Sequence, residues 1–396
     1  GKDTMNNFEF YNPTKVIFGK RTEEEVGKEI QDRGFKKVLI HFGGTYLYEN
    51  GTLDRVHKSL SDCGIGYVDL GGVVPNPRLG LVKEGIQLCR KEGIDFILAI
   101  GGGSPIDSAK GIAYGLANDF DVEDLLMGRF TTNRIAPLGC ISTIAATGSE
   151  TSNSMVITIE EGMLKRSYNH DCARPLFAIM NPELTYTLPP YQTASGAPEI
   201  MMHTMERYFT NTEHVELIDR MAEGLLVSVR EAALLAIKEP DNYNARADLM
   251  WAGSLSHNGL TGTGRVSDFA SHKIEHEMGG MFDVAHGAGL CAIWGSWARY
   301  VYKVNPARFA QFAVNVFDVP MDFHDLEGTA LKGIEAWEDW CRRLGMPTSM
   351  TELGIQPTEG QIEEMAEKCV ATGGGHVGFF KTLYKDDVIN IYHMAE

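Results

Sequence analysis

A carboxylate and an imidazole lie four residues apart in the segment TASGAPEIMMHTMERYF, residues 193–209. At helical spacing, Glu199 and His203 share one face of a helix. Their neighbours include Ala, Ile and Met, so a charge held among them needs a partner. The pair is therefore either part of a metal site or an ordinary contact beside a core.

Three more histidines fall in the segment SHKIEHEMGGMFDVAHGAG, residues 271–289. His272 and His276 are four apart on an expected helix, and His286 follows a pair of glycines. Three imidazoles and a carboxylate suit a first-row divalent cation such as Fe²⁺ or Zn²⁺. Spacing alone selects His272 and His276 as the ligand pair. Any one histidine could instead be a hydrogen-bonded core residue, but their joint occurrence in apolar helices favours a metal site.

A glycine loop is the second feature that could bind a ligand. The segment DFILAIGGGSPIDSAKGIA, residues 95–113, has the order strand, glycines, helix. Glycines let backbone N–H groups approach a phosphate, and the positive end of the helix attracts it. Ser104 is the expected N-cap, with Pro105 at the first helical position and Asp107 completing a capping box. A tight turn with a good cap would explain the same residues, and the loop is not the GxGxxG fingerprint.

A second loop, STIAATGSETSN at 142–153, follows the expected strand APLGCI. Its small and hydroxylated side chains could contact a nucleotide. A Ser/Thr-rich connection without a ligand is the alternative, and composition alone favours that alternative.

The elements that must position these residues change type near residue 187. The first part alternates strands with helices, which predicts a parallel sheet covered by helices. Its expected strands are 15–19, 37–44, 66–73, 95–103 and 175–184, with helices at 22–33, 48–62 and 79–92 and a hairpin over 155–169. After TLPP the pattern is helical: 191–209, 215–237, 242–258, 266–279, 287–303, 306–317, 326–343, 358–370 and 385–394. We expect an α/β nucleotide-binding domain over 1–187 and an all-helical metal-binding domain over 188–396, with the chemistry in a cleft between them.

Charge and composition exclude several classes of function. The formal net charge of −17 disfavours nucleic acid and anionic membranes as partners. No run approaches the roughly 20 apolar residues of a membrane span. The seven cysteines form no CxxC pair, which is typical of reduced thiols in a cytoplasmic protein.

The order of the motifs resembles that of a known family. GGGSPIDSAK, ATGSE, TLPP, a carboxylate-x₃-His helix and His-x₃-His-x₉-His occur in the order found in iron-containing (group III) alcohol dehydrogenases. The branch of butanol dehydrogenases and broad-range aldehyde reductases is the most similar, and the resemblance covers nearly the whole chain. It implies a dehydroquinate-synthase-like two-domain fold and a homodimer. It also implies a metal-dependent, NAD(P)-linked oxidoreductase acting on small primary alcohols and aldehydes.

The resemblance also implies roles for individual residues. The metal ligands would be Glu199, His203, His272 and His286, while His276 would be a catalytic proton relay outside the coordination shell. That assignment overrules the choice of His276 as a ligand from spacing. The implied cofactor-binding residues are Gly43, Gly44, Thr45, Tyr46, Gly101, Gly102, Gly103, Ser104, Asp107, Thr143, Thr147, Val156 and Lys165.

Two departures from the family pattern bear on metal and cofactor. The family has Asp where this chain has Glu199, so a catalytically impaired metal- or nucleotide-binding homologue is one alternative. In the turn HFGGTYLYENG, Thr45 and Tyr46 replace a Gly and a Ser of the NADP-dependent relatives, and Tyr48 and Glu49 replace two lysines. Because the 2′-phosphate of NADP would lose cationic partners there, we expect NAD(H) to be favoured over NADP(H). A glycerol-dehydrogenase-like or dehydroquinate-synthase-like enzyme is the other alternative.

Overall fold

The computed structural model describes residues 3–396, which form two compact units. The α/β unit comprises Tyr11–Leu188 and Asp241–Ser254. The helical unit comprises the described residues before Tyr11, together with Pro189–Pro240 and Leu255–Glu396. The chain thus leaves the α/β unit at the TLPP segment and returns to it once.

A six-stranded parallel sheet forms the centre of the α/β unit. Its order is β1 (Lys15–Phe18), β8 (Phe177–Met180), β5 (Leu138–Ser142), β4 (Phe96–Gly101), β2 (Lys37–Phe42) and β3 (Gly66–Leu70). In the register, Leu39 pairs with Ile97 and Ile97 with Leu138. The inner strands are almost wholly apolar because a parallel sheet is buried on both faces. The predicted α/β class is confirmed.

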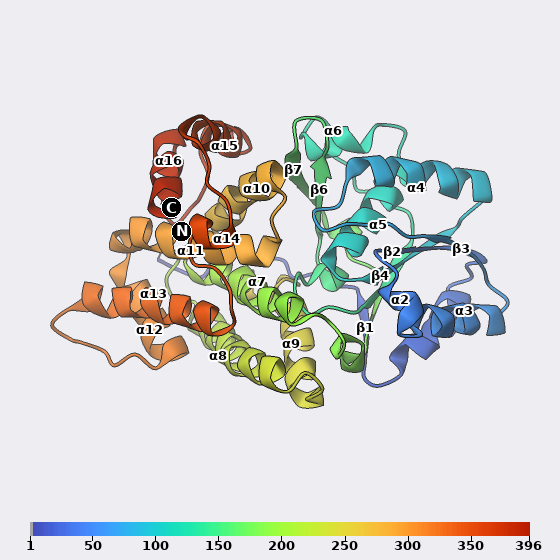
Figure 1. Cartoon of the computed structure of the whole chain (residues 1–396), viewed down its shortest axis with the longest axis horizontal. Helices are drawn as coiled ribbons and strands as arrows, with labels where there is room; N and C mark the ends of the chain where they lie inside the picture. Colours follow the sequence, from blue (N-terminus) through green and yellow to red (C-terminus); the bar gives the residue numbers. More distant parts are fainter. Residues whose placement is uncertain (1–2) are drawn as a thin grey trace. The chain divides into compact units, whose positions relative to one another are not determined.

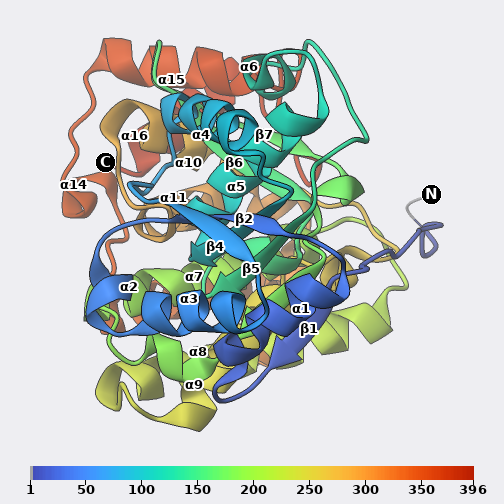
Figure 2. The ribbon, with the colours of Figure 1, turned by 90° about the vertical axis from the view of Figure 1, so that its right-hand side faces the viewer.

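Successive residues of each strand face opposite layers of helices. Leu39, Ile97 and Cys140 belong to the core that includes residues of α4, α5 and α6, whereas Val38 and Leu98 belong to the core that includes α1 and α3. Figures 1 and 2 show α4 and α5 on one side of the strands and α3 on the other. The helices of this unit are α1 (Val26–Asp32), α2 (Tyr46–Glu49), α3 (Thr52–Asp62), α4 (Leu79–Glu92), α5 (Gly103–Ala117) and α6 (Val122–Leu126), with 3₁₀ turns at Thr22–Glu25, Ser149–Thr151, Asp171–Ala173 and Pro182–Thr185.

Two further elements complete the α/β unit. Strands β6 (Ser154–Ile159) and β7 (Leu164–Asn169) form the antiparallel hairpin that the sequence predicts. Helix α9 (Tyr243–Leu255) supplies Met250 to the same core as α5. The hydroxyl of Ser254 donates to buried Glu150 at 2.6 Å.

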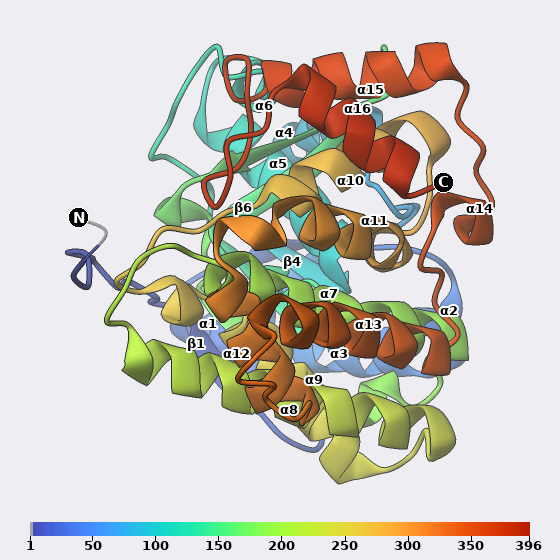
Figure 3. The same cartoon turned by 90° about the vertical axis from the view of Figure 1, so that its left-hand side faces the viewer.

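The helical unit surrounds a cluster of aromatic side chains. Phe209 lies 4.4 Å from Phe309 and 5.6 Å from Trp294, measured between ring centroids. Figure 3 shows α12 beside α13, and α15 beside α16. The helices are α7 (Pro190–Tyr208), α8 (Glu216–Lys238), α10 (Ala270–Phe282), α11 (His286–Val301), α12 (Pro306–Phe317), α13 (Leu326–Arg343), α14 (Met350–Leu353), α15 (Glu359–Ala371) and α16 (Lys385–Met394), with 3₁₀ turns at Leu260–Gly262 and Tyr302–Val304.

One local prediction is wrong. Helix α5 begins at Gly103 with Gly102 as its N-cap, and no side chain caps it. Ser104 therefore lies inside the first turn, and the carboxylate of Asp107 accepts a hydrogen bond from Ser149 at 2.5 Å instead of closing a capping box. The first N–H groups of α5 stay available for a ligand as a result. Within residues 3–396, no helix is both long enough and apolar enough to cross a bilayer.

Candidate functional site

The expected nucleotide-binding residues of the α/β unit gather at one edge of its sheet. Gly43–Tyr46 follow β2, Gly101–Ser104 end β4 and start α5, and Thr143 follows β5. Strands β2, β4 and β5 are neighbours and run parallel, so their carboxyl ends meet at the same edge. Open parallel sheets bind nucleotides at this edge.

Hydrogen bonds join these three segments into one surface. The hydroxyl groups of Tyr46 and Thr143 lie 3.0 Å apart, and the N–H of Thr143 donates to the carbonyl of Gly101 at 3.0 Å. Burial raises the pKa of Tyr46, so its phenol keeps its proton. A Cβ atom placed on Gly103 would lie 2.3 Å from the methyl group of Thr147, so the start of α5 contacts the second loop directly.

Two buried charges on α5 hold the second loop. Lys110 is fully buried, and its ammonium group donates to the carbonyls of Ser149, Ser152 and Ser154 at 2.8, 3.0 and 2.9 Å. Burial lowers the pKa of Lys110 to about 8. Asp107 lies one helical turn before Lys110, and burial raises the pKa of its carboxyl to about 6. The loop is therefore held by α5 through Lys110 and Asp107.

The hairpin brings the last two predicted cofactor residues to the same end of α5. The N–H of Val156 donates to the second oxygen of Asp107 at 3.2 Å. Lys165 pairs with Thr158 across the hairpin and lies close enough to Asp107 to lower the pKa of that carboxyl. The side chain of Lys165 is almost fully buried.

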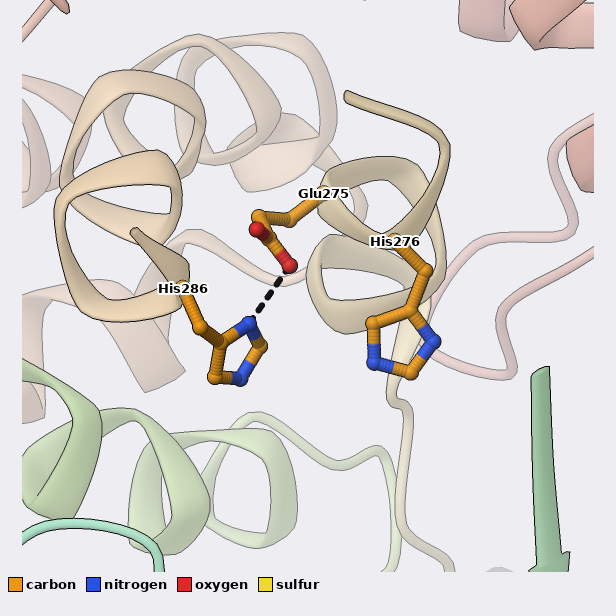
Figure 4. A group of neighbouring side chains, drawn as sticks. All are labelled: Glu275, His276 and His286. Atoms are coloured by element: carbon orange, nitrogen blue, oxygen red, sulfur yellow. Dashed lines mark hydrogen bonds and ion pairs between the residues drawn. The ribbon is translucent and has the colours of Figure 1, made fainter. Parts of the chain in front are cut away.

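In the helical unit, two histidines are each oriented by a buried carboxylate. Nδ1 of His272 donates to Glu206 at 2.7 Å, and the same oxygen accepts the backbone N–H of His272 at 3.0 Å. Nδ1 of His286 donates to Glu275 at 2.5 Å, as Figure 4 shows. A carboxylate can only accept, so each bond leaves the lone pair on Nε2. This is the arrangement that orients imidazoles as metal ligands.

Two glycines let the helices approach closely enough for these contacts. A Cβ atom on Gly287 would lie 2.0 Å from the carbonyl oxygen of Ser195, so the start of α11 lies directly against α7. A Cβ atom on Gly289 would lie 2.8 Å from the side chain of Glu275. The sequence HGAG thus places His286 beside α7 and leaves room for the carboxylate that orients it.

The four residues expected as metal ligands lie together. Nε2 of His286 is 3.5 Å from a carboxylate oxygen of Glu199. The ring of His272 is 4.8 Å from that of His203 and 5.3 Å from that of His286, between centroids. Burial lowers the pKa of His203 well below its usual value, and the nearby His272 and Arg207 lower it further. The neutral imidazole is the form that binds metals.

The donor atoms fit a divalent cation. Among the residues that the structure describes, no group hydrogen-bonds to the buried Nε2 of His272, the nitrogen opposite the Glu206 bond. A buried polar atom without a partner is costly, and coordination would satisfy it. Glu199, Glu206 and Glu275 are buried as well, and a cation would compensate their charge.

His276 lies at the edge of the same group. Single ligand atoms of Glu275, His276 and His286 lie within 4.8 Å of one another, so these three side chains offer a second possible ligand set. Figure 4 shows Glu275 and His276 side by side on α10, with the ring of His286 across from them. Because Glu275 is bonded to Nδ1 of His286, its carboxylate orients that ring rather than completing this second set.

Sequence reasoning missed four residues around the site: Glu206, Arg207, His257 and Glu275. The spacing of Glu206 could have revealed it, since it follows Glu199 by seven residues and shares its helical face. Glu275 follows His272 by three residues and carried the same kind of signal. His257 carried none, because it lies between α9 and the Leu260–Gly262 turn and reaches the site only through tertiary packing.

Comparison with known protein families gives matches over both parts of the chain. The model for "Iron-containing alcohol dehydrogenase" matches residues 13–182. The model for "Fe-containing alcohol dehydrogenase family, C-terminal" matches residues 193–396.

Individual relatives match almost end to end. The NADH-dependent butanol dehydrogenase A of Clostridium acetobutylicum is 36% identical over 389 residues, covering 98% of this chain and 99% of the relative. The NADPH-dependent aldehyde reductase YqhD of Escherichia coli is 32% identical over 394 residues, covering 99% and 100%. The crystal structure of NADH-dependent butanol dehydrogenase A from Thermotoga maritima superimposes with a TM-score of 0.95 at 35% identity, covering 99% of each chain.

Proposed function

The chain belongs to the iron-containing alcohol dehydrogenase family, and we propose that it interconverts small primary alcohols and aldehydes with a divalent metal and NAD(P)(H). The observation that carries the proposal is the close group of Glu199 and three imidazoles, in which the buried Nε2 of His272 has no hydrogen-bond partner among the described residues. Fe²⁺ is the metal that the family name indicates.

In this proposal the metal is held by Glu199, His203, His272 and His286. When bound, the cation supplies a Lewis acid that polarises the substrate carbonyl. Glu206 and Glu275 keep His272 and His286 in the tautomer whose Nδ1 carries the proton, so both rings are oriented before metal arrives.

The edge of the sheet holds the nucleotide in this proposal. The uncapped start of α5 offers backbone N–H groups to the pyrophosphate, and Lys110 and Asp107 keep the second loop against it. When bound, the nicotinamide supplies or accepts the hydride.

His276 is the proposed proton relay. Reducing an aldehyde to an alcohol adds a proton to oxygen as well as a hydride to carbon. The side chain of His276 is half-buried, so its ring can exchange protons with water while lying beside His286. Histidine is the side chain that most often serves as a proton relay at neutral pH.

We propose that NADH is preferred over NADPH. The short helix α2 carries Tyr46, Tyr48 and Glu49 directly after β2. The phenol of Tyr46 is bonded to Thr143 and fills space at the sheet edge, while Glu49 would repel a 2′-phosphate. The relatives' names include both NADH- and NADPH-dependent enzymes, so family membership does not decide the cofactor. The proposed preference therefore rests on the residues of this chain.

A second copy of the chain is the partner that we propose for an apolar surface of the helical unit. Met5, Phe8 and Phe10 are 42%, 54% and 50% exposed, and Phe379 is 69% exposed. Asn6 and Phe379 line one hollow together with Val266, so the segment that carries Met5 and Phe8 lies on the same side of the unit as Phe379. Exposed apolar patches of this kind mark contacts between subunits. Light scattering should give the mass of a dimer, and Phe8→Asp with Phe379→Asp should give that of a monomer.

An activity screen tests the proposed function. The chelator-treated protein is reloaded with Fe²⁺ or Zn²⁺ and assayed with aldehydes of increasing chain length and with both reduced cofactors. We expect reduction of butanal and similar aldehydes only with metal present. Oxidation of glycerol in preference to simple alcohols would favour the glycerol-dehydrogenase-like alternative. Bound metal and NADH without any turnover would identify a binding protein that Glu199 has inactivated.

A further inference from the structure

His203 differs from the other two proposed metal-binding histidines in how its ring is held. His272 and His286 each donate to a carboxylate, Glu206 and Glu275 respectively. No group of the described chain hydrogen-bonds to Nδ1 of His203. An imidazole ligand without such a bond needs another contact to fix its orientation.

That contact is the flat face of another imidazole. The rings of His203 and His257 are stacked with centroids 3.9 Å apart and an angle of 14° between their planes. The ring of His272 lies toward His203 at 4.8 Å and 22°. The ring of His203 is thus restrained by two aromatic faces, of which His257 is the nearer and the more nearly parallel.

Arg207 fixes His257 in turn. Its guanidinium donates to Nδ1 of His257 at 3.0 Å, to the carbonyl of Ser256 at 3.2 Å and to the carbonyl of His203 at 2.7 Å. It also lies over the ring of Phe269, 4.8 Å from the centroid. A guanidinium can only donate, so Nδ1 of His257 accepts. One side chain therefore ties His257 to the same turn of α7 that carries His203.

We propose that His257 is a positioning residue for the metal site: its ring, held by Arg207, sets the orientation of His203. The inference rests on the proposed function, because it requires His203 to bind the metal. Neither His257 nor Arg207 belongs to the proposed ligand set. Groups that orient metal ligands typically change metal affinity by about 10–100-fold.

The test uses Co²⁺ bound to the full chain, since its visible absorption reports the number and geometry of its ligands. His257→Ala should bind Co²⁺ about tenfold more weakly and show an altered spectrum, with unchanged affinity for NADH. His257→Phe keeps a flat ring and should retain the spectrum of the wild type. His376→Ala removes an exposed histidine of the same unit and should change neither quantity.

The outcomes separate this inference from the proposed function. If His272→Ala loses Co²⁺ while His257→Ala binds it with the affinity and spectrum of the wild type, the role of His257 is refuted and the metal site stands. If His272→Ala binds Co²⁺ as the wild type does, the metal site itself is wrong and the role of His257 falls with it. Should His257→Ala not fold, a folded His257→Phe variant with an altered spectrum would refute the stacking role alone.

Discussion

Replacing Lys110 by Met tests whether a buried ammonium group holds the second nucleotide loop. Lys110 is fully buried and donates to the carbonyls of Ser149, Ser152 and Ser154. Methionine has a similar length, so the substitution removes the donor and leaves little cavity. It leaves two carbonyls of the second loop and one at the start of β6 without their partner.

The size of the effect follows from two opposing contributions. Each buried carbonyl left unpaired costs roughly 1–3 kcal/mol, so the three together cost roughly 3–9 kcal/mol. Burial lowers the pKa of Lys110 from 10.5 to about 8, and removing the charge recovers about 3 kcal/mol of that desolvation cost at neutral pH. Subtracting the recovered ~3 kcal/mol leaves a fall in the free energy of unfolding of roughly 0–6 kcal/mol, or about 3 kcal/mol at the middle of the range.

Urea unfolding followed by circular dichroism measures this loss, and fluorescence titration measures NADH affinity. We expect weaker NADH binding as well, because the loop carries Thr147 and approaches the start of α5. Lys58→Met is the matched control, since Lys58 is exposed on α3 of the same unit and forms an ion pair with surface Asp62. If Lys110→Met unfolds at the same urea concentration as Lys58→Met and binds NADH like the wild type, the anchoring role of Lys110 is refuted.

Four further predictions use the same geometry. His276→Ala should keep its metal and lose turnover by about 10²–10⁴-fold, as measured by metal content and kcat; loss of the metal would instead support the Glu275–His276–His286 ligand set. Glu199→Asp should be active and bind Fe²⁺ at least as tightly, in a chelator competition; a metal-free variant would show that α7 is adapted to Glu. Tyr46→Ser should raise kcat/KM for NADPH relative to NADH, and an unchanged ratio would exclude Tyr46 from cofactor selection. Burial lowers the pKa of His41 from 6.5 to about 4, so the stability that its neutral ring contributes is full above pH 6.5 and is lost as the pH falls through 4. Urea unfolding at several pH values should show that His41→Gln removes up to about 3 kcal/mol of this pH dependence.

Elements with a strong hydrophobic pattern could be predicted from the sequence. Strand β2 and helix α13 lie where apolar periodicity placed them, because their local preference and their burial agree. The start of α5 could not be predicted in the same way. Ser104 and Asp107 have the spacing of a capping box, but Asp107 is bonded to Ser149 and Val156, which lie more than forty residues later in the sequence.

The candidate metal site also has one part that the sequence predicts and one part that depends on the fold. Glu199, His203, His272 and His286 could be named from motif order. The spacing of Glu206 and Glu275 points toward the site, but which histidine each carboxylate orients required the fold, because the contact between His286 and Glu275 depends on how α11 lies against α10. Helix α9 is a further example, since its helical pattern does not reveal that Met250 completes a core of the α/β unit.

A titration of metal against activity tests the central claim most directly. The chelator-treated wild type and His272→Ala are titrated with Fe²⁺ without oxygen, and NADH oxidation by butanal is followed at each addition. We expect the activity of the wild type to rise from near zero and to saturate at a single equivalent of metal per chain, while His272→Ala stays inactive over the same range. Full activity of the chelated wild type, or an identical titration curve for His272→Ala, would contradict the account.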